Sequence, residues 1–123
     1  MNWIAIGIGA ALGAIARHQL SQFYANTSGA SFNVGILIAN ILGSFCIGLL
    51  YSIANSWPEV WRLTLVTGFL GALTTFSSFS LDVNLLFAQK LNLSAVGLAA
   101  AHLCGGLLAC RLGLWITRYS FFT

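Results

Sequence analysis

The chain has 123 residues, of which 59% are hydrophobic and only 6% are charged, and its mean hydropathy is +0.90. A soluble domain carries about a quarter charged residues, so this composition excludes a water-soluble globular protein and favours the lipid bilayer as solvent. Five basic and two acidic residues give a net charge of +3 without any basic run, which excludes a nucleic-acid-binding surface. We therefore expect residues 1–123 to form one transmembrane domain.

Four apolar segments make up most of the chain, and each is long enough to cross a bilayer as a helix of roughly 20 residues. They lie at about residues 3–21, 34–54, 60–89 and 93–117. This order predicts an all-α membrane protein with four transmembrane helices. The first segment begins with "MNWIAIGIG", which lacks the basic start and the cleavage site of a signal peptide, so we expect a retained helix.

The orientation of a membrane protein follows the basic residues in its short loops, and here they are evenly divided. Arg17 and Lys90 fall on one side of the membrane, and Arg62 and Arg118 fall on the other. The even division predicts a chain that inserts in both orientations. Arg17 either extends its charge to the membrane interface or forms a positive mouth that attracts anions, and both interpretations stay open.

Asn40, in "LIANILGS", places an amide about two turns inside the second segment. A polar side chain at membrane depth marks either a partner or a transport pathway. One interpretation is a hydrogen bond between helices, and the other is a donor directed at an anion. Taken alone, the residue favours the hydrogen bond between helices.

The third segment is about thirty residues long, which is too long for one straight crossing, and "GALTTFSSFS" near its middle is unusually polar. Thr74 and Thr75 permit a helix break there, because hydroxyl groups replace lost backbone hydrogen bonds. Either a small cation or the hydroxyl groups alone satisfy the freed carbonyl groups, and the sequence leaves both interpretations open. Phe76, Phe79 and Ser80 follow on one helix face, where ring edges favour an anion, although paired phenylalanines are more often core residues.

Small residues repeat every four positions in the fourth segment, which predicts close contact with another helix. They are Gly97, Ala101, Gly105, Ala109 and Gly113.

His102, in the same segment, is expected at the membrane interface. Asp82, toward the end of the third segment, is the one carboxylate available to a proton-coupled pathway, and a local polar contact is its favoured role. The three cysteines lie in apolar segments without metal-binding spacing, so we expect them to be buried apolar residues.

Three motifs in order resemble those of the Fluc/CrcB fluoride channels, a family of small dual-topology dimers. The stretch "GFLGALTTFSSFS" resembles the family signature, and "GIGAALGAIARH" resembles its Gly-rich first-helix motif, which ends in Arg. The stretch "GILIANILGSFCIG" resembles its second-helix motif, in which Asn is followed by Gly. The length, the four-segment layout and the absence of charge bias agree, so the resemblance covers nearly the whole chain.

The resemblance implies a passive, fluoride-selective channel rather than an enzyme. It implies export of fluoride from the cytoplasm across a bacterial plasma (inner) membrane, by an antiparallel homodimer surrounded by lipid. It also implies a fluoride pore with a donor amide, two phenylalanine ring edges, a hydroxyl at the far end and a vestibule arginine. These pore residues are Asn40, Phe76, Phe79, Ser80 and Arg17.

The resemblance further implies a structural sodium ion at the centre of the dimer. The backbone carbonyl groups of Gly71 and Thr74 match the positions that hold this ion at the helix break. The sequence departs from the family pattern at Ile36, where Thr is common, and at Gly106 and Cys110, where the fourth helix often offers Ser and Thr. The polar side chains that follow one another along the ion path form its polar track. These departures predict that the polar track has fewer polar groups, is filled by water or is rebuilt from other residues.

Three other functions remain as alternatives. A small four-helix, dual-topology, proton-coupled exporter has the same size, but that class requires a glutamate in the first helix, where this chain has no acidic residue. The altered polar track leaves one subunit of a heteromeric fluoride channel as a second alternative. A non-transporting assembly subunit accounts for the glycine stripes, but not for Asn40 together with "TTFSSFS".

Overall fold

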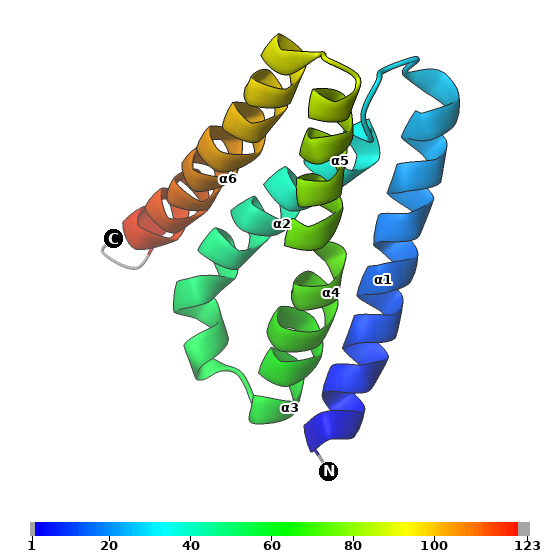
Figure 1. Cartoon of the computed structure of the whole chain (residues 1–123). Helices are drawn as coiled ribbons and strands as arrows, with labels where there is room; N and C mark the ends of the chain where they lie inside the picture. The colour runs from blue at the N-terminus through cyan, green and yellow to red at the C-terminus, as the bar shows by residue number, and fades with distance from the viewer. Residues whose placement is uncertain (1, 121–123) are drawn as a thin grey trace.

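The computed structural model describes residues 2–120, with side chains described for residues 2–117. Helices are the only regular structure within that range (Figure 1). The α-helices are α1 (Asn2–Thr27), α2 (Val34–Ile53), α3 (Glu59–Arg62), α4 (Gly71–Leu73), α5 (Phe76–Ala88) and α6 (Asn92–Ser120). A 3₁₀ turn, η1 (Ala54–Ser56), follows α2, and a π-helical stretch, η2 (Leu63–Leu70), joins α3 to α4. The expectation of an all-α protein is confirmed for the part of the chain that the structure describes.

Three helical stretches are long and apolar enough to cross a membrane: Val34–Ser56, Glu59–Ala88 and Asn92–Thr117. They agree closely with the second, third and fourth segments expected from the sequence. Among the described residues, α1 does not reach the same level of hydropathy, because Arg17, His18 and Gln19 lie within it. A fourth crossing by α1 therefore stays a prediction.

The first helix is longer than expected, since α1 ends at Thr27 rather than near Ser21. The hydroxyl groups of Thr27 and Ser28 donate to the carbonyl oxygens of Phe23 and Tyr24, each at 2.8 Å, and so satisfy acceptors of the last turn. Residues 22–33 fall between the first two segments expected from the sequence. The first residues of this range continue the helix instead, because their short polar side chains bond to the helix end.

The third segment is broken, as predicted, at Thr74 and Thr75. Thr74 has an extended backbone with ψ of 148°, and Thr75 is extended with φ of −150° and ψ of 119°. Helix α4 stops before them and α5 begins after them, so the two halves are separate in the middle of the protein (Figure 1). Figure 1 also shows this broken helix between α1 and α6, with α2 behind it.

Glycines let the helices approach until backbone meets backbone. A Cβ at Gly9 or Gly13 of α1 would collide with carbonyl groups of η2, and a Cβ at Gly113 of α6 would collide with the Phe45 carbonyl of α2. The predicted stripe is thus confirmed toward the C-terminal half of α6. At its other end Gly97 faces open space.

Many large apolar side chains lie on the outside of the single chain, which fits a protein surrounded by lipid or by another subunit. Phe76 is 78% exposed although it follows directly on the helix break. Two small clusters fill the interior, one around Leu70 and Leu73 and the other around Leu86. These buried clusters therefore hold the helix break in place, while one side of the break stays open to the outside of the single chain.

Candidate functional site

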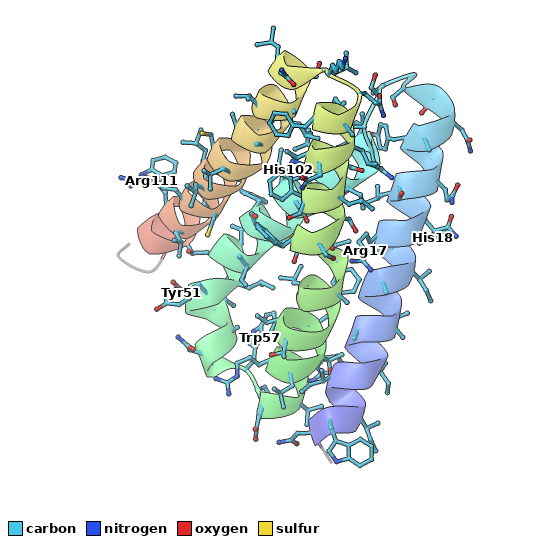
Figure 2. All side chains as sticks on the ribbon, viewed as in Figure 1. Arg17, His18, Tyr51, Trp57, His102 and Arg111 are labelled. Atoms are coloured by element: carbon cyan, nitrogen blue, oxygen red, sulfur yellow. The ribbon has the colours of Figure 1, made fainter. Side chains whose placement is uncertain are left out.

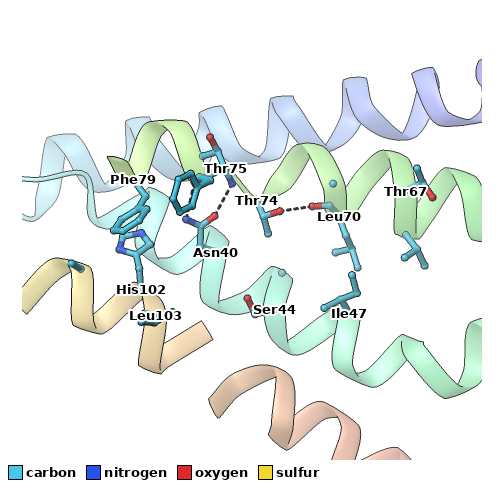
Figure 3. Close-up of a pocket in the computed structure, with 15 residues that line it drawn as sticks. Asn40, Ser44, Ile47, Thr67, Leu70, Thr74, Thr75, Phe79, His102 and Leu103 are labelled. Atoms are coloured by element: carbon cyan, nitrogen blue, oxygen red, sulfur yellow. Dashed lines mark hydrogen bonds between the residues drawn. The ribbon is translucent and has the colours of Figure 1, made fainter. Parts of the chain in front are cut away.

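The side-chain amide of Asn40 holds the helix break together. Its Oδ1 accepts a hydrogen bond from the Thr75 backbone N–H at 2.8 Å, and its Nδ2 donates to the Thr75 carbonyl oxygen at 3.1 Å (Figure 3). The amide therefore pairs with an extended residue as a neighbouring β-strand would. The favoured interpretation of Asn40, a hydrogen bond between helices, is confirmed. An amide nitrogen carries two hydrogens, so one donor remains beyond the bond to Thr75.

Thr75 also begins the second half of the broken helix. Its Oγ1 accepts from the Ser78 backbone N–H at 3.3 Å, which is the geometry of an N-cap. The same oxygen lies 3.2 Å from the hydroxyl groups of both Ser77 and Ser78. The hydroxyl groups of Thr75, Ser77 and Ser78 thus gather at the start of α5.

The first half of the broken helix ends with two kinds of carbonyl group. The Leu70 oxygen accepts from both the backbone N–H and the hydroxyl of Thr74, at 3.1 and 3.0 Å. Within residues 2–120, by contrast, no donor is hydrogen-bonded to the carbonyl oxygens of Gly71 and Thr74. Hydroxyl groups therefore satisfy part of the break, and the carbonyl oxygens of Gly71 and Thr74 are among the acceptors that remain there. Such acceptors fit a small cation, which takes oxygen ligands.

An open groove of about 820 Å³ runs along the break (Figure 3). Five residues singled out from the sequence line it together, although they come from two separate segments. They are Asn40, Gly71, Thr74, Phe76 and Phe79. Helix α6 closes the same groove with Ala99, His102 and Leu103. The structure thus brings the candidate amide, both candidate rings and both candidate carbonyl positions to one place.

The two candidate rings pack edge to face at the start of α5. The centroids of Phe76 and Phe79 are 5.4 Å apart with an interplanar angle of 66°. Phe79 also lies against the imidazole of His102, with centroids 4.4 Å apart and planes at 35° (Figure 3). Aromatic rings are negative on their faces and positive at their edges, so the part of a ring that faces the groove decides whether it favours a cation or an anion.

The expectation that His102 lies at the membrane interface is wrong. The residue lies about three turns into α6, is 9% exposed and lines the groove. Its Nδ1 is 3.2 Å from the Leu98 carbonyl oxygen, and its Nε2 has no hydrogen-bond partner among the described residues. The sequence offered a signal that was misinterpreted: a histidine ten positions inside an apolar helix belongs at depth, not at the end.

Two candidate pore residues lie outside the groove. Ser80 is half-buried on α5, one turn beyond Phe76, and does not line the groove. Arg17 is half-buried on α1, one turn beyond Gly13, and Gly13 touches the backbone at Phe69 and at the end of α4. Figure 2 shows Arg17 on the side of α1 that faces the broken helix, whereas His18 points away from it. The guanidinium is therefore near the level of the break but not in the groove.

Asp82 makes a local polar contact, as the sequence favoured. Its Oδ2 accepts from the Asn33 backbone N–H at 3.2 Å, at the N-terminus of α2. A carboxylate at that position also stabilises the positive end of the helix dipole. Asp82 is not among the groove-lining residues, so the carboxylate that proton-coupled transport would need has a structural partner instead.

A hydroxyl group from another helix lies next to Gly106. Ser44 of α2 lines the groove, and a Cβ built at Gly106 would lie 3.3 Å from its hydroxyl oxygen. A side chain at position 106 would therefore crowd Ser44. Sequence reasoning missed Ser44, and its only signal was a serine one turn after Asn40.

Comparison with known proteins identifies the family. The family model described as "CrcB-like protein, Camphor Resistance (CrcB)" matches residues 4–114. A protein of Mannheimia succiniciproducens named "Fluoride-specific ion channel FluC" is 45% identical over 94% of this chain and 93% of its own length. Proteins of the same name from Pasteurella multocida and Albidiferax ferrireducens are 44% and 43% identical, over 94% and 90% of this chain and 92% and 86% of their own lengths. The chain therefore belongs to the CrcB-like family.

Proposed function

We propose that the chain is a passive, fluoride-selective ion channel that exports fluoride from the cytoplasm and so lowers its toxicity. The observation that carries the proposal is the groove at the helix break, where Asn40, Phe76 and Phe79 meet. Relatives that are 43–45% identical over most of the chain bear the name of a fluoride-specific ion channel. A channel makes and breaks no covalent bond, and we assign no catalytic residue.

Fluoride loses part of its hydration shell in a narrow path, so the path must supply hydrogen-bond donors or positive edges in its place. Asn40 has one amide hydrogen left after its two bonds to Thr75, and this hydrogen is the donor that we assign to the ion. The ring edges of Phe76 and Phe79 supply weak positive charge along the same groove. Neither feature demands a proton, which fits passive flow rather than proton coupling.

Arg17 and Ser80 are assigned to the two ends of the path. A guanidinium stays charged at all physiological pH values, so Arg17 raises the local concentration of anions in a vestibule near the break. The hydroxyl of Ser80 follows one turn after Phe76 and offers a donor where the ion leaves the rings. Both groups act outside the groove, which agrees with their places on α1 and α5.

The complete channel is an antiparallel homodimer of chains that each cross the membrane four times. Two observations support a second copy: the groove is open on one side, and Phe76 is 78% exposed although it borders the groove. A partner placed against this side would close the path and bury the ring. The even division of basic residues between the two sides allows the opposite orientations that such a dimer requires.

The free carbonyl oxygens at the helix break support the proposal that a sodium ion binds there. Gly71 and Thr74 offer oxygens that accept no hydrogen bond within residues 2–120, and a Cβ at Gly71 would meet nothing within 4 Å. These two carbonyl groups, together with their copies in the partner subunit, would hold the ion. Its positive charge would neutralise the negative end of the first half-helix and join the subunits.

Reconstitution of the purified chain alone tests the function. Liposomes loaded with equal concentrations of fluoride and chloride are diluted into ion-free medium, and the efflux of both ions is recorded together. We expect rapid fluoride efflux without chloride efflux, in a bacterial-type lipid mixture and without a pH gradient. Equal efflux of both ions, or efflux only with a pH gradient, would refute a fluoride-selective passive channel.

A further inference from the structure

The two extended residues of the helix break are held in different ways. Thr75 is bonded to the Asn40 amide through both of its backbone groups. The backbone N–H of Thr74 bonds to the Leu70 carbonyl oxygen at 3.1 Å, and its own carbonyl oxygen accepts no hydrogen bond within residues 2–120. Because this carbonyl oxygen is a proposed ligand of the cation, the contacts of the Thr74 side chain decide where the ligand lies.

Gly43 of α2 leaves a recess that the methyl group of Thr74 fills. A Cβ built at Gly43 would collide with the Cγ2 of Thr74 and would lie 3.8 Å from its Cβ. Gly43 is buried and lies three positions after Asn40, so the two residues share one side of α2. Helix α2 therefore contacts both residues of the break, Thr75 through the Asn40 amide and Thr74 through the recess at Gly43.

The two branches of the Thr74 side chain are held by two different segments. The hydroxyl donates to the Leu70 carbonyl oxygen at 3.0 Å, within the same half-helix, and the methyl group lies against Gly43 (Figure 3). A β-branched side chain has few χ1 rotamers. Any other rotamer would move both branches and lose at least one of these contacts, so the two contacts together fix Thr74 relative to α2.

We propose that Gly43 is a positioning residue for the cation site: by leaving room for the Thr74 methyl group, it sets the direction of the Thr74 carbonyl group toward the ion. The inference rests on the cation of the proposed function and adds to it a residue that touches no ion. Metal–ligand distances tolerate errors of about 0.2 Å, which is less than the shift that a collision with an added methyl group would force. A side chain at position 43 therefore weakens cation binding without removing a ligand.

An exchange of one methyl group between the two positions tests this contact. Gly43→Ala adds a methyl group where Thr74 lies, and Thr74→Ser removes the methyl group there while it keeps the hydroxyl for Leu70. We expect Gly43→Ala to need about tenfold more sodium for half of its stabilisation, and Thr74→Ser to need at most about threefold more. In the double variant the new methyl group takes the vacated space, so its sodium requirement should return to within about threefold of the wild type.

Thermal unfolding of the detergent-solubilised protein, followed by circular dichroism, measures the sodium requirement. A cation that binds the folded protein alone raises the unfolding midpoint as its concentration rises. A large organic cation replaces sodium at each point, so that the ionic strength stays constant. The readout is independent of fluoride flux and therefore reports on the cation site itself.

Two controls separate the contact from a general loss of packing. Gly105→Ala also adds a methyl group at a helix contact, where its Cβ would lie 3.2 Å from the Ile41 Cδ1, and neither residue lines the groove. We expect its sodium requirement to equal that of the wild type, whatever its midpoint without sodium. Thr74→Val in the Gly43→Ala background keeps a methyl group against the filled recess, so it should not restore sodium binding as Thr74→Ser does.

Each outcome decides the matter. Restored sodium binding in the double variant supports the proposal. A double variant that needs as much sodium as Gly43→Ala overturns it, as does wild-type sodium binding in Gly43→Ala or an equally raised requirement in Gly105→Ala. If Gly43→Ala alone does not fold, a folded, sodium-responsive double variant supports the proposal, and an unfolded one overturns it.

The wild-type chain distinguishes the two levels of the account. A wild-type midpoint that ignores sodium refutes the cation of the proposed function, and the role of Gly43 with it. A wild-type midpoint that rises with sodium, without rescue in the double variant, refutes the role of Gly43 alone.

Discussion

Replacing Asn40 with alanine tests whether one amide holds the helix break. The substitution removes two hydrogen bonds, from the Thr75 N–H at 2.8 Å and to the Thr75 carbonyl at 3.1 Å. Both Thr75 groups then lose their partners in the interior of a membrane protein. No neighbouring residue replaces them, because Thr75 is extended and lies outside both helix halves.

The expected loss of stability follows from these two groups. An unpaired buried donor or acceptor costs about 1–3 kcal/mol, so Asn40→Ala should lower the free energy of unfolding by about 2–6 kcal/mol. Water from the open groove replaces part of the lost hydrogen bonding, so we expect the free energy of unfolding to fall by roughly 2 kcal/mol. Titration of the detergent-solubilised protein with sodium dodecyl sulfate, followed by circular dichroism, measures the change.

Two further variants make the experiment specific. Asn84→Ala is the matched control, because Asn84 is exposed on α5 and, among the described residues, its side chain bonds only to the Ser80 carbonyl one turn earlier. We expect it to unfold like the wild type. Asn40→Asp keeps an acceptor for the Thr75 N–H but sets its second oxygen against the Thr75 carbonyl oxygen, so it should be at least as destabilised as Asn40→Ala and should fail to conduct fluoride. Wild-type stability in Asn40→Ala would refute the role of the amide in the break.

Three further predictions concern packing, proton coupling and the cation. Gly9→Ala should destabilise the protein by about 1–3 kcal/mol, because its methyl group meets the backbone of η2, whereas Gly7→Ala, with nothing within 4 Å, should not destabilise it. Equal stability of these two variants in denaturant titrations would contradict the close packing. Asp82→Asn should leave fluoride efflux intact at every pH gradient, and a loss of efflux confined to imposed gradients would revive proton-coupled export. Replacing sodium with a large organic cation should weaken the dimer in size-exclusion chromatography, if the Gly71 and Thr74 carbonyl groups hold the ion; an unchanged elution profile would speak against a cation at the break.

The helix break could be predicted from the sequence because its causes are local. A run of hydroxyl residues and glycine in the middle of a segment too long for one crossing indicated both the break and its position. The N-cap at Thr75 is also a local feature, since a threonine precedes the start of α5. Such features depend on residues a few positions apart, and the sequence states them directly.

The partners of the break could not be predicted, because they are far apart in the chain. Asn40 and Thr75 are 35 positions apart, and neither residue indicates the other without the packing of α2 against the broken helix. The contact between His102 and Phe79 could not be predicted for the same reason, since it exists only after α5 and α6 meet. The longer α1 reflects capping by Thr27, which outweighed the loop preference of its neighbours.

The most direct test of the central claim is fluoride efflux through variants of the groove rings. Phe76→Ile and Phe79→Ile remove the ring edges while keeping apolar bulk, and Phe87→Ile is the control, because Phe87 is exposed on the same helix and lies outside the groove. We predict that both groove variants lose fluoride efflux from liposomes while they elute as the wild type does in size-exclusion chromatography, and that Phe87→Ile conducts normally. Wild-type fluoride efflux through both groove variants would contradict the assignment of this groove as the ion path.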